Sequence, residues 1–298
     1  MKREVFTSFD GKQLELYVWD DVANAKAVVK IAHGMAEHCG RYDHFATFLN
    51  ANGYVVVAND HRGHGATDPN TLGYAEGDMF EGNVKDQIEI VNYCANRYNL
   101  PVVLFGHSYG SFVTQAVINA NPSVATYVLS GSNYMKDFTF ALCKSLAKGM
   151  MKKHGGNYPA KLLADMSFGM YEKKIPGKNN WLSRDASQVA KYNEDEWCGF
   201  VCSANFYYTF MDGISKLYKP NLRKTMALDK PILIVSGDND PVGNYGKGVK
   251  KLAAYYKRMK VVDVTTKLYD GARHELLNET NSDQVYQDVL AWLNGVVK

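Results

Sequence analysis

The chain has 298 residues, 46% of them hydrophobic, so it can bury a large core as one α/β domain or as a domain with an insertion. Its net charge of +3 is too small to indicate a nucleic-acid partner. No stretch approaches the roughly 20 apolar residues of a membrane span. The start, MKREVFTSFDGKQ, lacks the apolar segment of a secretory signal.

The first part of the chain alternates apolar strands with amphipathic helices. Residues 4–9 and 13–19 alternate apolar and polar side chains around Asp10-Gly11, which predicts a β-hairpin. Beyond it the pattern predicts, in chain order, strand 27–32, helix 42–52, strand 54–58, helix 81–98, strand 102–105 and strand 125–129. Continuous apolar strands between such helices indicate a parallel sheet covered on both faces.

One segment of this pattern, LPVVLFGHSYGSFVTQAVINAN (100–121), carries a serine on a sharp bend. An apolar strand runs into Gly106-His107-Ser108-Tyr109-Gly110, and apolar residues then recur at helical spacing. Glycines around the bend let a strand reverse abruptly into a helix, as a G-x-S-x-G nucleophile elbow requires. Because the pentapeptide is a weak motif on its own, the interpretation requires a base, an acid and an oxyanion hole elsewhere.

The pattern of buried strands stops at residue 131. Residues 132–227 carry helix-like stretches rich in Met, Phe and Tyr, and hold 15 Lys/Arg against 8 Asp/Glu. This change of composition predicts a cap inserted between two parts of one core, 1–131 and 228–298. The αβ pattern resumes with strands at 231–235 and 261–264 and ends in a helix at 282–297.

The loops after these two late strands hold the candidate partners of Ser108. A serine hydroxyl needs an imidazole to take its proton and a carboxylate to orient that imidazole, here in the chain order Ser, Asp, His. We predict Asp240 as the acid and His274 as the base. Asp238 is a rival acid, but Pro241 restricts Asp240 to an extended backbone that can direct its carboxylate outward.

The other histidines are predicted to have structural roles. His107 lies inside the elbow, where we expect local hydrogen bonding. His33, His38, His61 and His64 lie at turns and loops, and no spacing among them indicates a metal site.

The oxyanion hole requires two backbone N–H groups. One is expected from Tyr109, the residue after the nucleophile, and the other from Met35, in the loop after an early strand.

Five sequence blocks together resemble the monoglyceride lipase and lysophospholipase group of α/β-hydrolases. They are HGMAEHCGRY (33–42), NDHRGHGATD (59–68), GHSYGS (106–111), SGDNDPVG (236–243) and YDGARHELLNE (269–279). The resemblance implies an α/β-hydrolase fold with a mostly parallel eight-stranded sheet, a helical cap, a Ser108–His274–Asp240 triad, and hydrolysis of glycerol or phospholipid esters without a cofactor.

The resemblance leaves the substrate open. Tyr109 and Ser111 stand where the mammalian lipases have smaller or thioether residues, and the cap shows no clear family motif. The same group is similar to cinnamoyl esterases and to some proline-specific aminopeptidases. A peptidase needs an acidic cluster for the substrate's ammonium group, which the basic cap argues against. A non-catalytic binding protein on this fold normally lacks a triad member.

The cap also bears on partners. Phe138, Leu142, Leu146 and Met150 recur at helical spacing, with Lys144, Lys148, Lys152 and Lys153 largely on other sides. This pattern fits a cap helix packed on the core or a basic lid in transient contact with anionic lipid surfaces. The odd number of cysteines, without CxxC spacing, predicts reduced thiols and a cytoplasmic protein. The resemblance implies a small-molecule ester as its substrate. Oligomeric state is not predicted.

Overall fold

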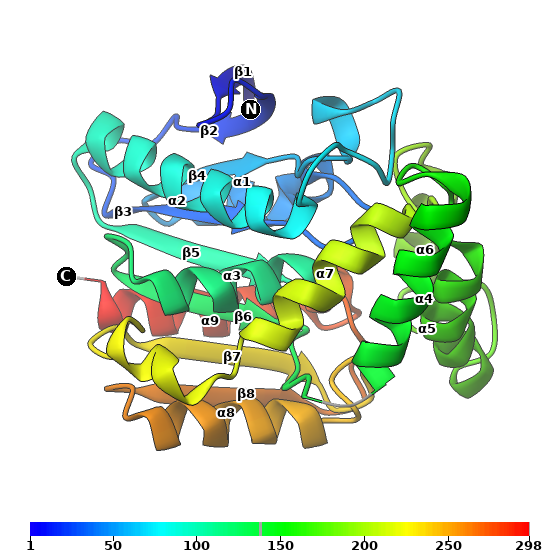
Figure 1. Ribbon diagram of the computed structural model, residues 1–298. Coiled ribbons are helices and arrows are strands. Elements are labelled where there is room, and N and C mark those ends of the chain that lie inside the picture. Colours follow the sequence, from blue (N-terminus) through cyan, green and yellow to red (C-terminus); the bar gives the residue numbers. More distant parts are fainter. Residues whose placement is uncertain (137–138, 298) are drawn as a thin grey trace.

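The computed structural model describes residues 1–136 and 139–297, which fold around an eight-stranded sheet (Figure 1). The strands are β1 (Lys2–Thr7), β2 (Gln13–Trp19), β3 (Ala27–Ala32), β4 (Tyr54–Asn59), β5 (Val102–His107), β6 (Thr126–Ser130), β7 (Ile232–Gly237) and β8 (Val264–Tyr269). Their order across the sheet is β1-β2-β4-β3-β5-β6-β7-β8. β2 pairs antiparallel with β1 and β4, and the remaining pairs are parallel. The predicted eight-stranded, mostly parallel sheet is confirmed.

The last strand begins later than the sequence pattern indicated. Val261 lies just after the preceding helix, whose last turn it caps, because its N–H donates to the carbonyl of Tyr256 at 3.2 Å. Val262 is 66% exposed, and the sheet takes up the chain only at Val264. An apolar run that serves first a helix end and then a strand gives no local signal of the boundary between them.

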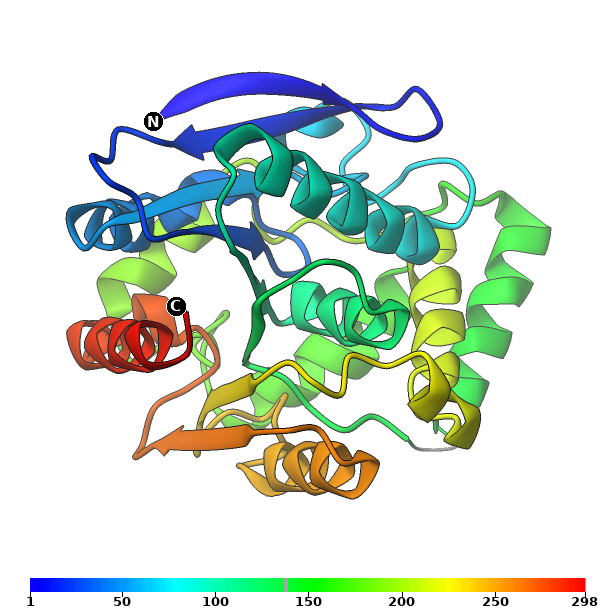
Figure 2. The same cartoon turned by 90° about the vertical axis from the view of Figure 1, so that its left-hand side faces the viewer.

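Helices cover both faces of the sheet (Figure 2). α1 (Asp43–Ala51) and α9 (Ser282–Val296) pack on one face, and α2 (Met79–Tyr98), α3 (Tyr109–Ala120) and α8 (Lys247–Met259) pack on the other. Strands β3, β4 and β5 are therefore buried along their whole length. Their near-continuous apolar sequence follows from this double burial.

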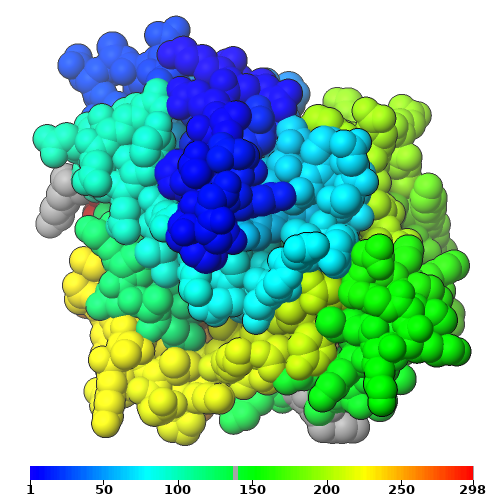
Figure 3. All heavy atoms as spheres, turned by 45° about the horizontal axis from the view of Figure 1, so that its top comes forward, coloured from blue at the N-terminus to red at the C-terminus, as the bar shows by residue number. Residues whose placement is uncertain are grey.

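Four helices lie between β6 and β7: α4 (Thr139–His154), α5 (Lys161–Lys174), α6 (Ala186–Glu194) and α7 (Ala204–Lys216). Figure 1 shows α4, α5 and α6 gathered at one end of the sheet, and Figure 3 shows the green segments in contact with the cyan and yellow ones. α7 packs on α2 and α4. Gly213 permits this close approach, since a Cβ there would lie 2.1 Å from the ring of Phe80. Phe138, predicted in the apolar stripe of this segment, lies outside the described residues.

Short 3-10 turns complete the described chain. They span Cys39–Tyr42, Gly65–Thr67, Pro220–Lys224 and Leu276–Asn278. None of the helices in the described ranges is both long and apolar enough to cross a membrane.

Candidate active site

Ser108 occupies a strained bend between β5 and α3. Its φ of 50° and ψ of −119° are uncommon for a residue with a side chain, and such strain persists only where the surroundings enforce it. The surroundings here leave no room on either side of the bend. A Cβ on Gly106 would lie 2.3 Å from Thr114 Oγ1, and one on Gly110 would lie 2.1 Å from the carbonyl oxygen of Ala32. The two glycines therefore make the bend possible.

Ser108, His274 and Asp240 form a continuous hydrogen-bonded chain. His274 Nε2 lies 2.8 Å from Ser108 Oγ, and His274 Nδ1 lies 2.9 Å from Asp240 Oδ2. Asp240 follows β7 and His274 follows β8, so the carboxyl ends of three parallel strands bring the three side chains together. This geometry lets the imidazole accept the serine proton while the carboxylate fixes its tautomer.

The environment of His274 favours its protonated form. Burial alone would lower the pKa of the imidazole, but the charge of Asp240 and its hydrogen bond outweigh burial and raise the pKa above 6.5. His274 is consequently a stronger base than a free histidine. Trp181 packs against its ring at a centroid distance of 5.2 Å and shields it from solvent.

Asp240 and Asp238 have different surroundings. Asp240 is fully buried, and its carboxylate accepts from the Val242 N–H (2.8 Å) and the Ser236 hydroxyl (3.3 Å) as well as from His274. Asp238 instead accepts the N–H of Gly271 at 2.7 Å. The rival carboxylate thus connects the β7 and β8 loops and does not contact the imidazole.

His107 departs from the expected local hydrogen bonding. Its ring makes no hydrogen bond with the described part of the chain and packs against His274 at 4.9 Å. Burial, followed by the neighbouring His274, lowers the pKa of His107 to about 4. It is therefore a neutral wall of the site at physiological pH.

The four loop histidines have the structural roles predicted for them. His33 accepts the N–H of His61 at 2.9 Å, and His61 in turn bonds to the carbonyl of His33 at 3.0 Å. His64 accepts the N–H of Ala36 at 3.2 Å. His38 pairs with Asp195 at 2.9 Å.

The Met35 and Tyr109 amides, predicted as the two oxyanion donors, are left without a hydrogen-bond acceptor among the described residues. The N–H groups on either side of Met35 are occupied, that of Gly34 by Glu37 Oε1 (2.5 Å) and that of Ala36 by His64. No hydrogen bond among the described residues uses the Met35 amide, and the Tyr109 amide belongs to the unpaired first turn of α3. Both residues line the same cavity as Ser108.

The unusual elbow residues have structural explanations. The Tyr109 ring is buried between Phe206 (4.9 Å) and Phe210 (5.0 Å) of α7, and its hydroxyl accepts from Asn83 at 3.0 Å. Ser111 donates to the carbonyl of Ser108 at 2.6 Å. The bulky tyrosine thus joins the elbow to α2 and α7.

Two cavities meet at Ser108. The larger has a volume of about 360 Å³ and is almost entirely apolar. Its walls come from the elbow and the α4–α7 segment, and include Phe112, Cys143, Leu163, Met166, Phe168 and Phe210. The smaller, of about 60 Å³, also has polar groups in its walls, from Glu37, Asn179, Tyr192 and Glu275. The site can therefore hold a long apolar group on one side of the serine and a small polar group on the other.

Sequence reasoning missed a buried ionic network beside the triad. Arg41 pairs with Glu275 through two hydrogen bonds (2.7 and 2.6 Å) and with Glu37 at 2.6 Å. Burial would raise the pKa of Glu275, but the charge and hydrogen bonds of Arg41 hold it at about 2. Since Glu37 binds the Gly34 amide and Glu275 follows His274, Arg41 connects the loop that contains Met35 to the loop that contains His274. The i, i+4 spacing of Glu37 and Arg41 was the only local signal.

Two groups of side chains have atoms close enough to share a metal ion. They are His33, Cys39 and Asp60, and His38, Asp195 and Cys198. In the first, Asp60 already accepts the N–H groups of Cys39 and Ala66 (both 2.8 Å). In the second, His38 already bonds to Asp195. Hydrogen bonding within the protein accounts for both groups.

Comparison with known proteins places this site in a family. A monoacylglycerol lipase of Mycolicibacterium smegmatis is 28% identical to this chain. The match covers 97% of this chain and 95% of the lipase. A mouse (Mus musculus) monoglyceride lipase is also 28% identical, over 96% of this chain and 88% of its own. A thermostable carboxyl esterase from Bacillus coagulans, solved in complex with glycerol, superposes with a TM-score of 0.90 at 25% identity, covering 100% of this chain and 99% of that one.

The family model described as "Serine aminopeptidase, S33" (Hydrolase_4) matches residues 23–281. The predicted resemblance to monoglyceride lipases and the prediction of a hydrolase are confirmed. The chain belongs to the Hydrolase_4 family of α/β-hydrolases.

Proposed function

We propose that the protein is a serine esterase that cleaves carboxylic esters of lipid-like alcohols, such as monoacylglycerols or lysophospholipids. The observation that carries this proposal is the apolar cavity of about 360 Å³ that opens on Ser108. Apolar surface removed from water contributes roughly 25 cal/mol per Å², so a cavity of this lining favours an acyl chain. The relatives named above as lipases and esterase support the same reaction.

The reaction proceeds through an acyl-enzyme. Ser108 Oγ attacks the ester carbonyl while His274 Nε2 takes its proton, and the imidazolium that forms is stabilised by Asp240. The amides of Met35 and Tyr109 stabilise the oxyanion. His274 then protonates the leaving alkoxide and afterwards activates the water that releases the acid and regenerates Ser108.

The two cavities divide the substrate between them. The acyl chain occupies the apolar cavity, and the leaving alcohol occupies the smaller cavity, where the Asn179 amide and the Tyr192 hydroxyl can bond to a glycerol-like group. Residues 132–227 then act as a cap on a core made of 1–131 and 228–298, because their helices supply most of the acyl cavity wall.

A serine aminopeptidase is the second candidate, since that activity describes the matching family model. It would need free carboxylates to bind the substrate's ammonium group. Glu37 and Glu275 face the smaller cavity, but both are already paired with Arg41. This pairing favours the esterase. Cinnamoyl-type esters are a further alternative, because an aromatic acyl group also fits an apolar cavity.

The cellular setting stays a prediction. All five cysteines are free thiols, which supports the predicted cytoplasmic location. We also propose that the cap makes transient contact with anionic lipid surfaces, because it is rich in lysine.

A substrate panel tests the proposal. Monoacylglycerols, lysophospholipids, p-nitrophenyl esters of graded chain length, feruloyl esters and aminoacyl amides are compared by kcat/KM. We expect esters with medium or long acyl chains to be cleaved fastest and aminoacyl amides slowest. Equal rates for all esters would refute the lipid preference, and faster cleavage of the amides would establish the peptidase.

A further inference from the structure

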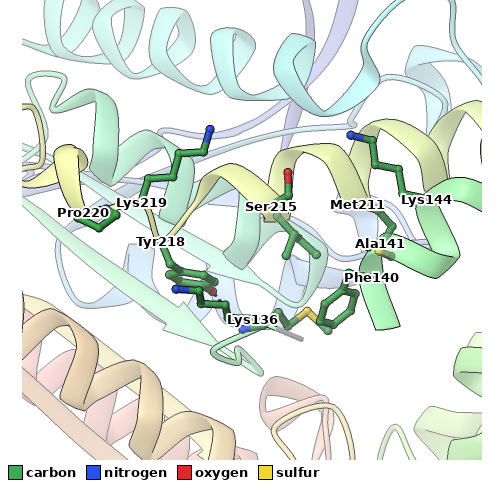
Figure 4. Close-up of a pocket in the computed structure, with 11 residues that line it drawn as sticks. Lys136, Phe140, Ala141, Lys144, Met211, Ser215, Tyr218, Lys219 and Pro220 are labelled. Carbon is green, nitrogen blue, oxygen red and sulfur yellow. Dashed lines mark hydrogen bonds between the residues drawn. The ribbon is translucent and has the colours of Figure 1, made fainter. Parts of the chain in front are cut away.

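A groove lies between the beginning of α4 and the end of α7, outside the two cavities that meet at Ser108 (Figure 4). It has a volume of about 460 Å³. Its floor is apolar, from Phe140, Met211, Ile214 and Tyr218 among others, and three lysines stand around it: Lys136, Lys144 and Lys219. We call it the lysine-rimmed groove.

The lysine-rimmed groove shares a wall with the apolar cavity. Met135, Phe140 and Met211 line both of them, so one layer of side chains separates the two spaces. Two of the three are methionines, whose unbranched side chains adapt readily to a ligand. Movement of these flexible side chains would join the two spaces and let an apolar chain extend from the cavity into the groove.

The charged residues that line the groove are all lysines. Figure 4 shows Lys219 and Lys144 on one side of it and Lys136 on the other. Asp212 neutralises Lys144 and also pairs with Lys216 at 2.6 Å. Within residues 1–136 and 139–297, no ion pair involves Lys136 or Lys219. Among the described residues, nothing neutralises these two ammonium groups, and we infer that they can bind an anion.

We propose that the lysine-rimmed groove binds the carboxylate of a free long-chain fatty acid, whose chain passes Met135, Phe140 and Met211 into the apolar cavity. The idea rests on the proposed function, because this acid is the product that hydrolysis of the acyl-enzyme releases. A monoacylglycerol has no charge for the lysines, so the groove distinguishes the acid product from that substrate. A fatty acid held this way excludes the next acyl chain and inhibits the enzyme competitively.

Calorimetric titration with laurate, and with dodecan-1-ol as its neutral counterpart, tests the site without depending on turnover. We expect laurate to bind more tightly than dodecanol. Lys136→Ala/Lys219→Ala should weaken laurate binding by about 2- to 30-fold, the sum of two partly exposed ion pairs, and leave dodecanol binding unchanged. The control, Lys250→Ala/Lys257→Ala, removes two exposed lysines of α8 and should change neither.

A second variant tests where the chain lies. Cys143 lines the apolar cavity but not the groove, so Cys143→Phe should weaken the binding of both ligands. Laurate should also inhibit hydrolysis of p-nitrophenyl butyrate competitively, and less so in the double lysine variant.

The outcomes separate this inference from the proposed function. Laurate binding that ignores both lysines, or that is unaffected by Cys143→Phe, would overturn the groove as a fatty-acid site even in an active esterase. Lysine-dependent laurate binding by a protein without esterase activity would support the site and refute the proposed function instead.

Discussion

Replacing Arg41 with methionine removes the centre of the buried ionic network while keeping an unbranched apolar side chain. The side chains of Arg41, Glu37 and Glu275 are only 11%, 4% and 6% exposed. Without the guanidinium, two carboxylates remain buried beside each other. Removing one partner of a buried pair costs about 3–5 kcal/mol, and we expect Arg41→Met to lower the free energy of unfolding by that amount. Urea unfolding followed by circular dichroism measures it.

The same change should slow the reaction. Glu37 holds the Gly34 amide next to Met35, and Glu275 follows His274, so losing Arg41 loosens both loops. We expect kcat to fall by up to about 10²–10³-fold, the effect of losing one oxyanion donor. KM should change less, because the apolar cavity is untouched.

Two controls separate charge from packing. Arg97→Met breaks the more exposed pair with Glu4 and should cost about 1 kcal/mol or less. Adding Glu37→Gln and Glu275→Gln to Arg41→Met removes the uncompensated charges and should restore most of the lost stability. A loss from Arg41→Met no larger than that from Arg97→Met would refute the reasoning.

Two further predictions concern the triad and the cavity. Because Asp240 raises the pKa of His274, the fall in kcat/KM on acidification should be centred above pH 6.5. Asp240→Asn should move that midpoint to lower pH and reduce kcat on the order of 10⁴-fold, whereas Asp238→Asn should reduce it far less; equal effects of the two variants would contradict the assignment of the acid. Cys143→Phe fills part of the apolar cavity, so it should lower kcat/KM for long-chain p-nitrophenyl esters while sparing the butyrate, and an unchanged chain-length profile would place the acyl group elsewhere.

Local pattern was sufficient to predict most of the core. The strands buried on both faces have continuous apolar sequences, which predict them. Gly106 and Gly110 predict the bend at Ser108, because neither position has room for a Cβ. The predicted start of β8 was wrong because Val261 caps the end of α8 and the exposed Val262 does not pair in the sheet.

In the candidate site too, some features could be predicted from the sequence and others could not. Ser108, Asp240 and His274 could be proposed from their order after successive strands. The contact of His107 with His274, and the pairing of Arg41 with Glu275, join residues far apart in the chain. The spacing of apolar and polar residues along the chain does not predict such contacts, because they depend on how the loops pack once the sheet has formed.

The central claim is that Ser108 is the nucleophile of an acyl-enzyme mechanism. The most direct measurement is mass spectrometry of the protein after reaction with a fluorophosphonate or a slowly deacylating p-nitrophenyl ester. We expect one adduct, on Ser108, that is absent from Ser108→Ala, together with a loss of kcat on the order of 10⁶-fold in that variant. An adduct on another residue, or near-full esterase activity in Ser108→Ala, would contradict it.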